Sequence, residues 1–173
     1  MQHGLLKGLN KVEQIANYSK ARRLLNNPFK YSFAIAFKKL IYPFFKKERL
    51  VFTRTFFGGN MQLALPASTD IYLTGGKSHP SEIRLAKFLI RNLKPMDTFI
   101  DIGAHYGYFS LLANEVMEQK GNIFSFEPSP NTYKLLKHNA ALVKNINAIQ
   151  QAVSNKEERI IFYEFPNLYA EYN

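Results

Sequence analysis

From residue 98 onward, short apolar runs alternate with segments whose apolar residues recur at helical spacing. Thr98 to Ile102 is predicted to be a strand, Tyr108 to Gln119 a helix and Ile123 to Phe126 a second strand. This alternation is typical of a parallel sheet with helices on its faces. Right-handed crossovers would place the second strand beside the first and the third beyond it. The fold class is therefore expected to be α/β.

The same pattern continues after the second strand. Ser129 is a good helix N-cap and Pro130 a good first helical residue, and the helix that they begin precedes a third strand at 146–153. A fourth strand is expected at 160–165, after a charged loop. Ligands of parallel sheets bind at the carboxyl ends of the strands. The glycine turn at 103–107 and Glu127 both follow such ends, so we expect them to converge on one crevice.

The turn after the first strand reads Asp101-Ile-Gly103-Ala-His-Tyr-Gly107. Gly103 allows a sharp turn and a close approach of the backbone to a ligand, and the helix that follows offers free N–H groups. Glu127 lies 24 residues after Gly103, where a carboxylate can accept hydrogen bonds from a ribose diol. Strand, turn, helix, strand and terminal acid together predict a nucleotide site.

The details of the turn limit which nucleotide fits. A dinucleotide fingerprint needs a second glycine where this chain has His105, and the phosphate-binding loop motif is absent. Asp101 disfavours a nearby phosphate but favours a cationic amine. S-adenosylmethionine has a ribose, an amino-acid ammonium and no phosphate, so it fits both ends. An NAD-dependent enzyme is the less favoured alternative.

Three stretches carry a resemblance to a known family. They are Phe99–Ser110 (Phe-Ile-Asp-Ile-Gly-Ala-His-Tyr-Gly-Tyr-Phe-Ser), Phe124–Pro130 (Phe-Ser-Phe-Glu-Pro-Ser-Pro) and Leu136–Asn139 (Leu-Lys-His-Asn). Together they resemble the FkbM family of S-adenosylmethionine-dependent methyltransferases over about residues 50–173. The resemblance implies a Rossmann-like class I methyltransferase fold. It also implies an enzyme that methylates hydroxyl oxygens, often on sugars or other secondary metabolites.

The resemblance assigns cofactor contacts to a small set of residues: Asp101, Gly103, Ala104, His105, Gly107, Glu127 and Pro128. The loop members of this set surround the methionine moiety, Glu127 holds the ribose hydroxyls and Pro128 lies near the adenine. His105 stands where the family more usually has Asn, and it can still donate a hydrogen bond. The methyl acceptor would be a hydroxyl of a small molecule or glycan. No catalytic base is identified.

Family members continue into an Asp-Val-Glu-Gly-like motif that this sequence lacks. About three strands of the parallel core are predicted here, whereas a class I methyltransferase sheet has seven. We therefore expect an incomplete sheet, from a truncated reading frame, a fragment or one half of a split protein. The alternative function is a catalytically inactive remnant whose basic N-terminus docks on a membrane or a protein partner.

The charge of the chain is concentrated in its first third. The formal net charge is +10, and residues 1–60 hold twelve basic and two acidic side chains, whereas residues 61–173 hold eleven of each. We assign residues 1–49 to a basic helical extension and residues 50–173 to the methyltransferase-like domain. Helices are expected over 1–27 and 29–42, the latter ending near Pro43. A hairpin is expected from runs at 50–57 and 61–65, and a short strand at 70–73.

The sequence of this extension limits the partners that we expect for it. Phe33, Phe37, Leu40, Ile41, Phe44 and Phe45 recur at helical spacing among lysines. They are expected to pack on the following domain, and the alternative is a peripheral contact of residues 29–49 with an anionic membrane. No nucleic-acid reader motif is present, so nucleic acid is not an expected partner.

The remaining composition points to a cytoplasmic location. The chain has no Cys and no His pair at metal-ligand spacing, so we expect neither disulfides nor a metal site. The first twenty residues lack the uninterrupted apolar core of a signal peptide. We therefore expect a cytoplasmic protein that is at most peripheral at the membrane.

Overall fold

The computed structural model describes residues 1–159 and residue 161. The chain forms two compact units, Met1–Phe88 and Leu89–Asn173, and the helix α6 (Pro80–Asn92) crosses the boundary between them. The hairpin that we assigned to the second domain lies in the first unit. There, the backbone N–H of Phe56 donates to the carbonyl of Gly75 at 2.8 Å, which ties the hairpin loop to the end of a helix. The domain limits of the sequence analysis stay a prediction.

The first unit begins with two helices. In α1 (Gln2–Ala16), Leu5, Leu9, Val12 and Ile15 are buried at the spacing of one helical face. In α2 (Lys20–Asn26), the Ser19 hydroxyl caps the first turn by accepting from the backbone N–H of Arg22. Both helices confirm the prediction of helical structure before Asn27.

The next helical segment is interrupted by one wide turn. The helix α3 (Pro28–Ala36), capped by Asn27, continues into a π-helical turn, η1 (Phe37–Ile41), and then into α4 (Tyr42–Phe45). The backbone N–H of Tyr42 donates to the carbonyl of Phe37, five residues earlier. The helical segment continues beyond Pro43. This proline lies in the first turn of α4, where a proline is tolerated. Our prediction that the helix stops near Pro43 was short by only a few residues.

The hairpin is antiparallel, as predicted, with different limits. The strands β1 (Arg49–Arg54) and β2 (Asn60–Leu65) pair from Arg49 opposite Leu65 to Arg54 opposite Asn60. Phe56 and Phe57 lie in the connecting loop instead of in the first strand.

The predicted strand at 70–73 was wrong, because these residues form the helix α5 (Thr69–Thr74). Gly75 ends α5 with a φ of +81°, and its N–H donates to the carbonyl of Ile71. The Thr74 hydroxyl donates to the carbonyl of Asp70 at 2.9 Å, so it also holds the helical turn in place.

Glu48, between α4 and β1, offers a test of pH dependence. Burial raises the pKa of its carboxyl from about 4.5 to about 7. The folded state therefore binds this proton more tightly than the unfolded chain does, and stability is lost as the pH rises from 4.5 through 7. We expect Glu48→Gln to raise the free energy of unfolding at pH 8, by roughly 1 kcal/mol. It should change little at pH 4. Urea unfolding at both pH values measures the difference, and an equal effect at the two would contradict it.

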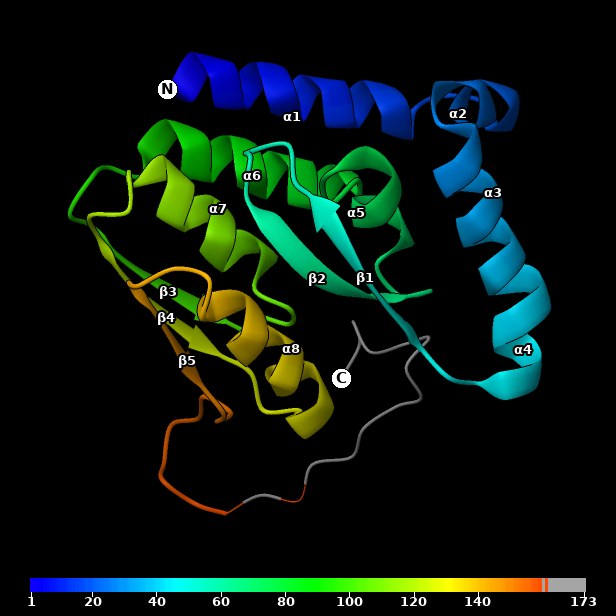
Figure 1. Cartoon of the computed structure of the whole chain (residues 1–173). Helices are drawn as coiled ribbons and strands as arrows, with labels where there is room; N and C mark the ends of the chain where they lie inside the picture. The colour runs from blue at the N-terminus through cyan, green and yellow to red at the C-terminus, as the bar shows by residue number, and fades with distance from the viewer. Residues whose placement is uncertain (160, 162–173) are drawn as a thin grey trace. The chain divides into compact units, whose positions relative to one another are not determined.

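The second unit contains the parallel sheet, which confirms the predicted α/β fold class. The strands β3 (Thr98–Ile102), β4 (Asn122–Phe126) and β5 (Ile146–Ile149) pair in the order β3-β4-β5, all parallel. The crossovers carry α7 (Tyr108–Val116) and α8 (Pro130–Ala140), and both helices lie on one face of the sheet (Figure 1). Ser129 caps α8 by accepting from the N–H of Thr132, as predicted.

Along each strand, side chains point alternately to the face of the sheet that the helices cover and to the open face. Ile123 and Ser125 are fully buried on the covered face, whereas Ile100 and Ile102 are 57% and 63% exposed on the other. The strand β3 is therefore covered on one face only. β5 ends at Ile149, short of the predicted Val153, and the strand predicted at 160–165 lies outside the described residues.

Candidate functional site

The turn after β3 is held against the end of β4. The backbone N–H groups of Gly103 and Ala104 both donate to the carbonyl of Phe126, each at 2.9 Å. Gly103 and Gly107 have φ values of +74° and +85°, in the left-handed region that favours glycine. His105 also lies in this region, with a φ of +51°. His, like Asn, is among the non-glycine residues enriched there, so this backbone conformation suits both residue types.

Gly103 faces open space. A Cβ atom built on it would meet no other atom within 4 Å, whereas a Cβ on Gly107 would lie 2.8 Å from Cδ1 of Leu136. The two glycines therefore differ in what they do. Gly107 lets α8 pack closely against the start of α7, and Gly103 leaves the backbone accessible at the carboxyl end of β3.

Glu127 lies at the carboxyl end of β4 and is only 6% exposed. Its Oε2 atom accepts from the backbone N–H of His105 at 2.9 Å, and its Oε1 atom accepts from that of Ser129 at 3.0 Å. The carboxylate thus joins the glycine turn to the N-terminus of α8. The two motifs that the sequence predicted to converge are therefore in direct contact.

Asp101, the last residue but one of β3, belongs to a short polar chain beneath α7. The Ser110 hydroxyl donates to Oδ2 of Asp101 at 2.5 Å and lies 2.7 Å from the Ser125 hydroxyl of β4. Burial raises the pKa of the Asp101 carboxyl, and the hydrogen bonds from Ser110 partly oppose this. A cationic group beside this carboxylate would therefore stabilise its charged form.

Asn139 holds the turn from its other side. Its side chain is fully buried, and its amide Nδ2 donates to the carbonyl of Tyr106 at 2.8 Å. Asn139 lies inside α8, and Ala141 is the C-terminal cap of this helix. The rings of His105 and Tyr106 lie in the same turn, with centroids 3.8 Å apart and planes tilted by 33°.

A hollow of about 720 Å³ lies at the carboxyl ends of β4 and β5. Phe126 and Pro128 line one part of it, and the segment 150–158 after β5 lines the rest. Gln150 and Gln151 bring amide groups to this hollow. We predicted a site role for Pro128 but not for the two glutamines, although their position directly after a strand was a usable signal.

The structure thus brings together most of the predicted site residues at one end of the sheet. Gly103, Ala104 and His105 contact the end of β4 directly, and Glu127 and Pro128 follow it. Asp101 lies one residue before the end of β3, on the face of the sheet that the helices cover, where its carboxylate accepts from the Ser110 hydroxyl. Periodicity did not reveal the supporting residues Ser110, Ser125 and Asn139, since each acts through a contact between elements far apart in the sequence.

Within residues 1–159 and 161, no group of three or more His, Cys, Asp or Glu side chains could hold a metal ion. Over the same residues, no helix has the length and apolar character needed to cross a membrane.

A parallel sheet with a glycine turn after one strand and an acid at the end of the next defines a nucleotide-binding class of α/β domain. Comparison with known proteins indicates which family within this class the chain resembles. Residues 101–171 match the model of the methyltransferase FkbM domain, which confirms the predicted resemblance to this family over that stretch.

One curated relative is the methyltransferase SdnD of Sordaria araneosa. It is 34% identical to this chain over 82 residues, which are 46% of this chain and 31% of the relative. The chain therefore matches about a third of the length of that protein.

Proposed function

We propose that the second unit binds S-adenosylmethionine across the carboxyl ends of β3 and β4, and that the chain provides the cofactor site of a methyltransferase. The observation that carries this proposal is the pairing of Glu127 with the glycine turn. A buried carboxylate that accepts from the His105 N–H lies directly beside the open backbone of Gly103. A ligand that reaches both groups needs a hydroxyl-bearing part and a part that packs on bare backbone.

The residues present suit each part of this cofactor. The open side of Gly103 accommodates close approach of the methionine moiety, and Asp101 supplies a carboxylate for its ammonium group. The carboxylate of Glu127 lies at the carboxyl end of β4, where it can accept from the ribose hydroxyls. The hollow between Pro128 and Gln150 is wide enough for a purine ring, and its amide groups can hydrogen-bond to ring nitrogens.

When bound, S-adenosylmethionine would supply a methyl group on a sulfonium sulfur. The task of this chain's residues is then to hold the donor in one orientation, since alignment is the main protein contribution to such a displacement. Glu127 is suited to that role because its carboxylate is itself fixed by two backbone donors. The resemblance favours the hydroxyl oxygen of a sugar, other glycan or secondary metabolite as acceptor.

Calorimetric titration of the full chain with S-adenosylhomocysteine tests the proposal. We expect saturable one-to-one binding, and no comparable heat with NADH. Asp101→Asn should weaken binding roughly tenfold by removing one charged partner of the ammonium group.

Asp97→Asn is the matched control, because Asp97 precedes the opposite end of β3, where its carboxylate accepts from the backbone N–H of Lys94. It should leave the affinity unchanged. Absence of heat in a folded sample, or equal losses in the two variants, would contradict the proposed site.

A further inference from the structure

The end of the α3–α4 segment exposes a group of large apolar side chains. Leu40, Ile41, Phe44 and Phe45, here called the apolar tip, are 65%, 42%, 81% and 69% exposed. We expected these residues to pack with Phe33 and Phe37 in one inward stripe. In the structure, Phe37 is buried and the tip is not.

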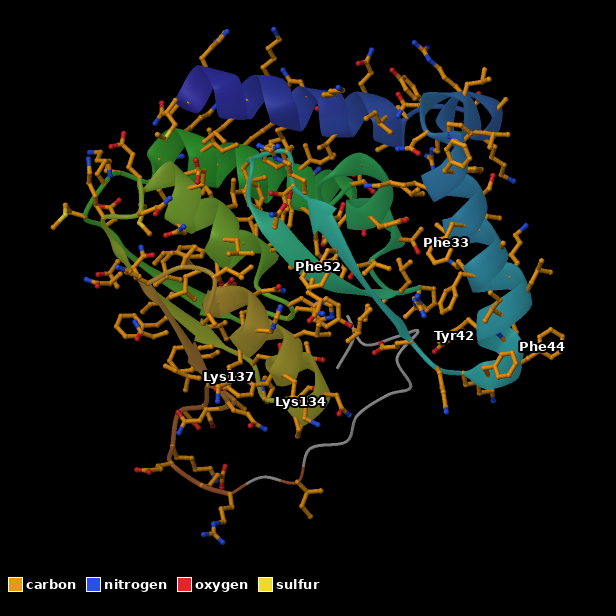
Figure 2. The ribbon with its side chains drawn as sticks, viewed as in Figure 1. Phe33, Tyr42, Phe44, Phe52, Lys134 and Lys137 are labelled. Carbon is orange, nitrogen blue, oxygen red and sulfur yellow. The ribbon has the colours of Figure 1, made fainter. Side chains whose placement is uncertain are left out.

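The π-helical turn explains this division. Ala34 and Phe37 are buried at a helical spacing of three, but the next buried residue is Tyr42, five positions after Phe37. In a regular helix, Ile41 would follow on the buried face. The extra residue in η1 puts Tyr42 there instead and leaves Ile41 and Phe44 outside. Figure 2 shows Tyr42 on the side of α4 toward β1 and Phe44 on the opposite side.

Four exposed lysines lie next to the tip in the sequence. Lys38, Lys39, Lys46 and Lys47 are all exposed and flank it on both sides in sequence. Residues 14–47 contain eight basic and no acidic side chains, so no carboxylate of this stretch offsets them. Exposed aromatic and aliphatic side chains flanked by lysines are typical of a helix that lies in a membrane interface.

We propose that the apolar tip and its four lysines dock the chain on the surface of an anionic lipid bilayer. Phe44 and Phe45 enter the boundary between headgroups and acyl chains, and the lysines contact the negatively charged headgroups. The contact is interfacial, and its residues are all outside the candidate cofactor site. Its success or failure is therefore independent of the proposed function.

Charge complementarity favours this partner over the two main alternatives. A second copy of the chain would bring a second set of these four lysines against the first, so that like charges would lie opposite one another. A protein partner would need an acidic surface with an apolar centre, whereas an anionic bilayer offers both properties everywhere on its surface.

The first test uses a fluorescent reporter. The chain has no tryptophan, so Phe44→Trp introduces a single one at the tip. With vesicles containing 30% phosphatidylserine, its emission should shift to shorter wavelength, and with phosphatidylcholine alone it should shift little. Phe52→Trp, on β1 and 61% exposed, is the control that should not respond. No shift at Phe44→Trp, or equal shifts at both positions, would overturn the proposal.

The second test separates docking by the tip from attraction by net charge. In co-sedimentation with the same vesicles, Lys46→Glu/Lys47→Glu should reduce the bound fraction at least tenfold, and Phe44→Ser/Phe45→Ser should do the same. Lys7→Glu/Lys11→Glu changes the net charge equally, on exposed positions of α1, and should reduce binding much less. Equal losses for the two lysine pairs would show nonspecific attraction and overturn the proposal. Self-association through the tip, detected by light scattering without vesicles, would also overturn it.

Discussion

Gly121→Ala is expected to lower the free energy of unfolding of the second unit by roughly 3 kcal/mol. A Cβ atom at this position would lie 2.4 Å from the backbone carbonyl oxygen of Asp97 and 2.7 Å from Sδ of Met117. Neither neighbour can move freely. The Asp97 carbonyl accepts from the N–H of Asn122 at 3.1 Å, and Met117 is fully buried. Urea unfolding followed by circular dichroism measures the loss.

Gly103→Ala is the matched control for this prediction. A Cβ at Gly103 meets nothing within 4 Å, so the substitution should cost only the left-handed backbone penalty, about 1–2 kcal/mol. A loss at Gly121 no larger than that at Gly103 would contradict the close packing at the start of β4.

Glu127→Ala is expected to lower the free energy of unfolding by about 2–4 kcal/mol and to abolish measurable binding of S-adenosylhomocysteine. Its removal leaves the N–H groups of His105 and Ser129 without the carboxylate that accepts from both. The turn then loses one of its links to α8, at the place where the ribose would be held. Binding is measured at a temperature at which circular dichroism shows the variant to be folded.

Glu118→Ala provides the comparison, because Glu118 is exposed and its carboxylate forms an ion pair with Lys120. Its loss should change the free energy of unfolding little, in keeping with an exposed ion pair, and leave binding intact. If Glu127→Ala kept wild-type affinity, the carboxylate would have a structural role alone.

The second unit could be predicted largely from its sequence because its signals are local. The strand at 98–102 and the cap at Ser129 follow from composition and spacing. The contact between the glycine turn and Glu127 follows from a general property of parallel sheets, whose carboxyl ends lie together. By contrast, the bond from Asn139 to the Tyr106 carbonyl joins residues 33 apart, and nothing in the helical period of α8 indicates it.

The first unit was predicted less well for a specific physical reason. Our prediction of one apolar stripe from Phe33 to Phe45 assumed a continuous helical period. A single additional residue in η1 shifts that period by one position. Phe37–Ile41 itself contains no glycine or proline that would mark the wide turn. The helix at 69–74 was likewise mistaken for a strand, because a segment of six residues is too short for its period to be read.

Titration of ¹⁵N-labelled full-length chain with S-adenosylhomocysteine, followed by amide chemical shifts, tests the central claim most directly. The account predicts saturable shifts at Gly103, Ala104 and His105 and at Gln150 and Gln151, which all follow carboxyl ends of strands. Gly121, at the amino end of β4, should not shift. Shifts confined to the amino end of the sheet, or none at ligand concentrations in the millimolar range, would contradict it.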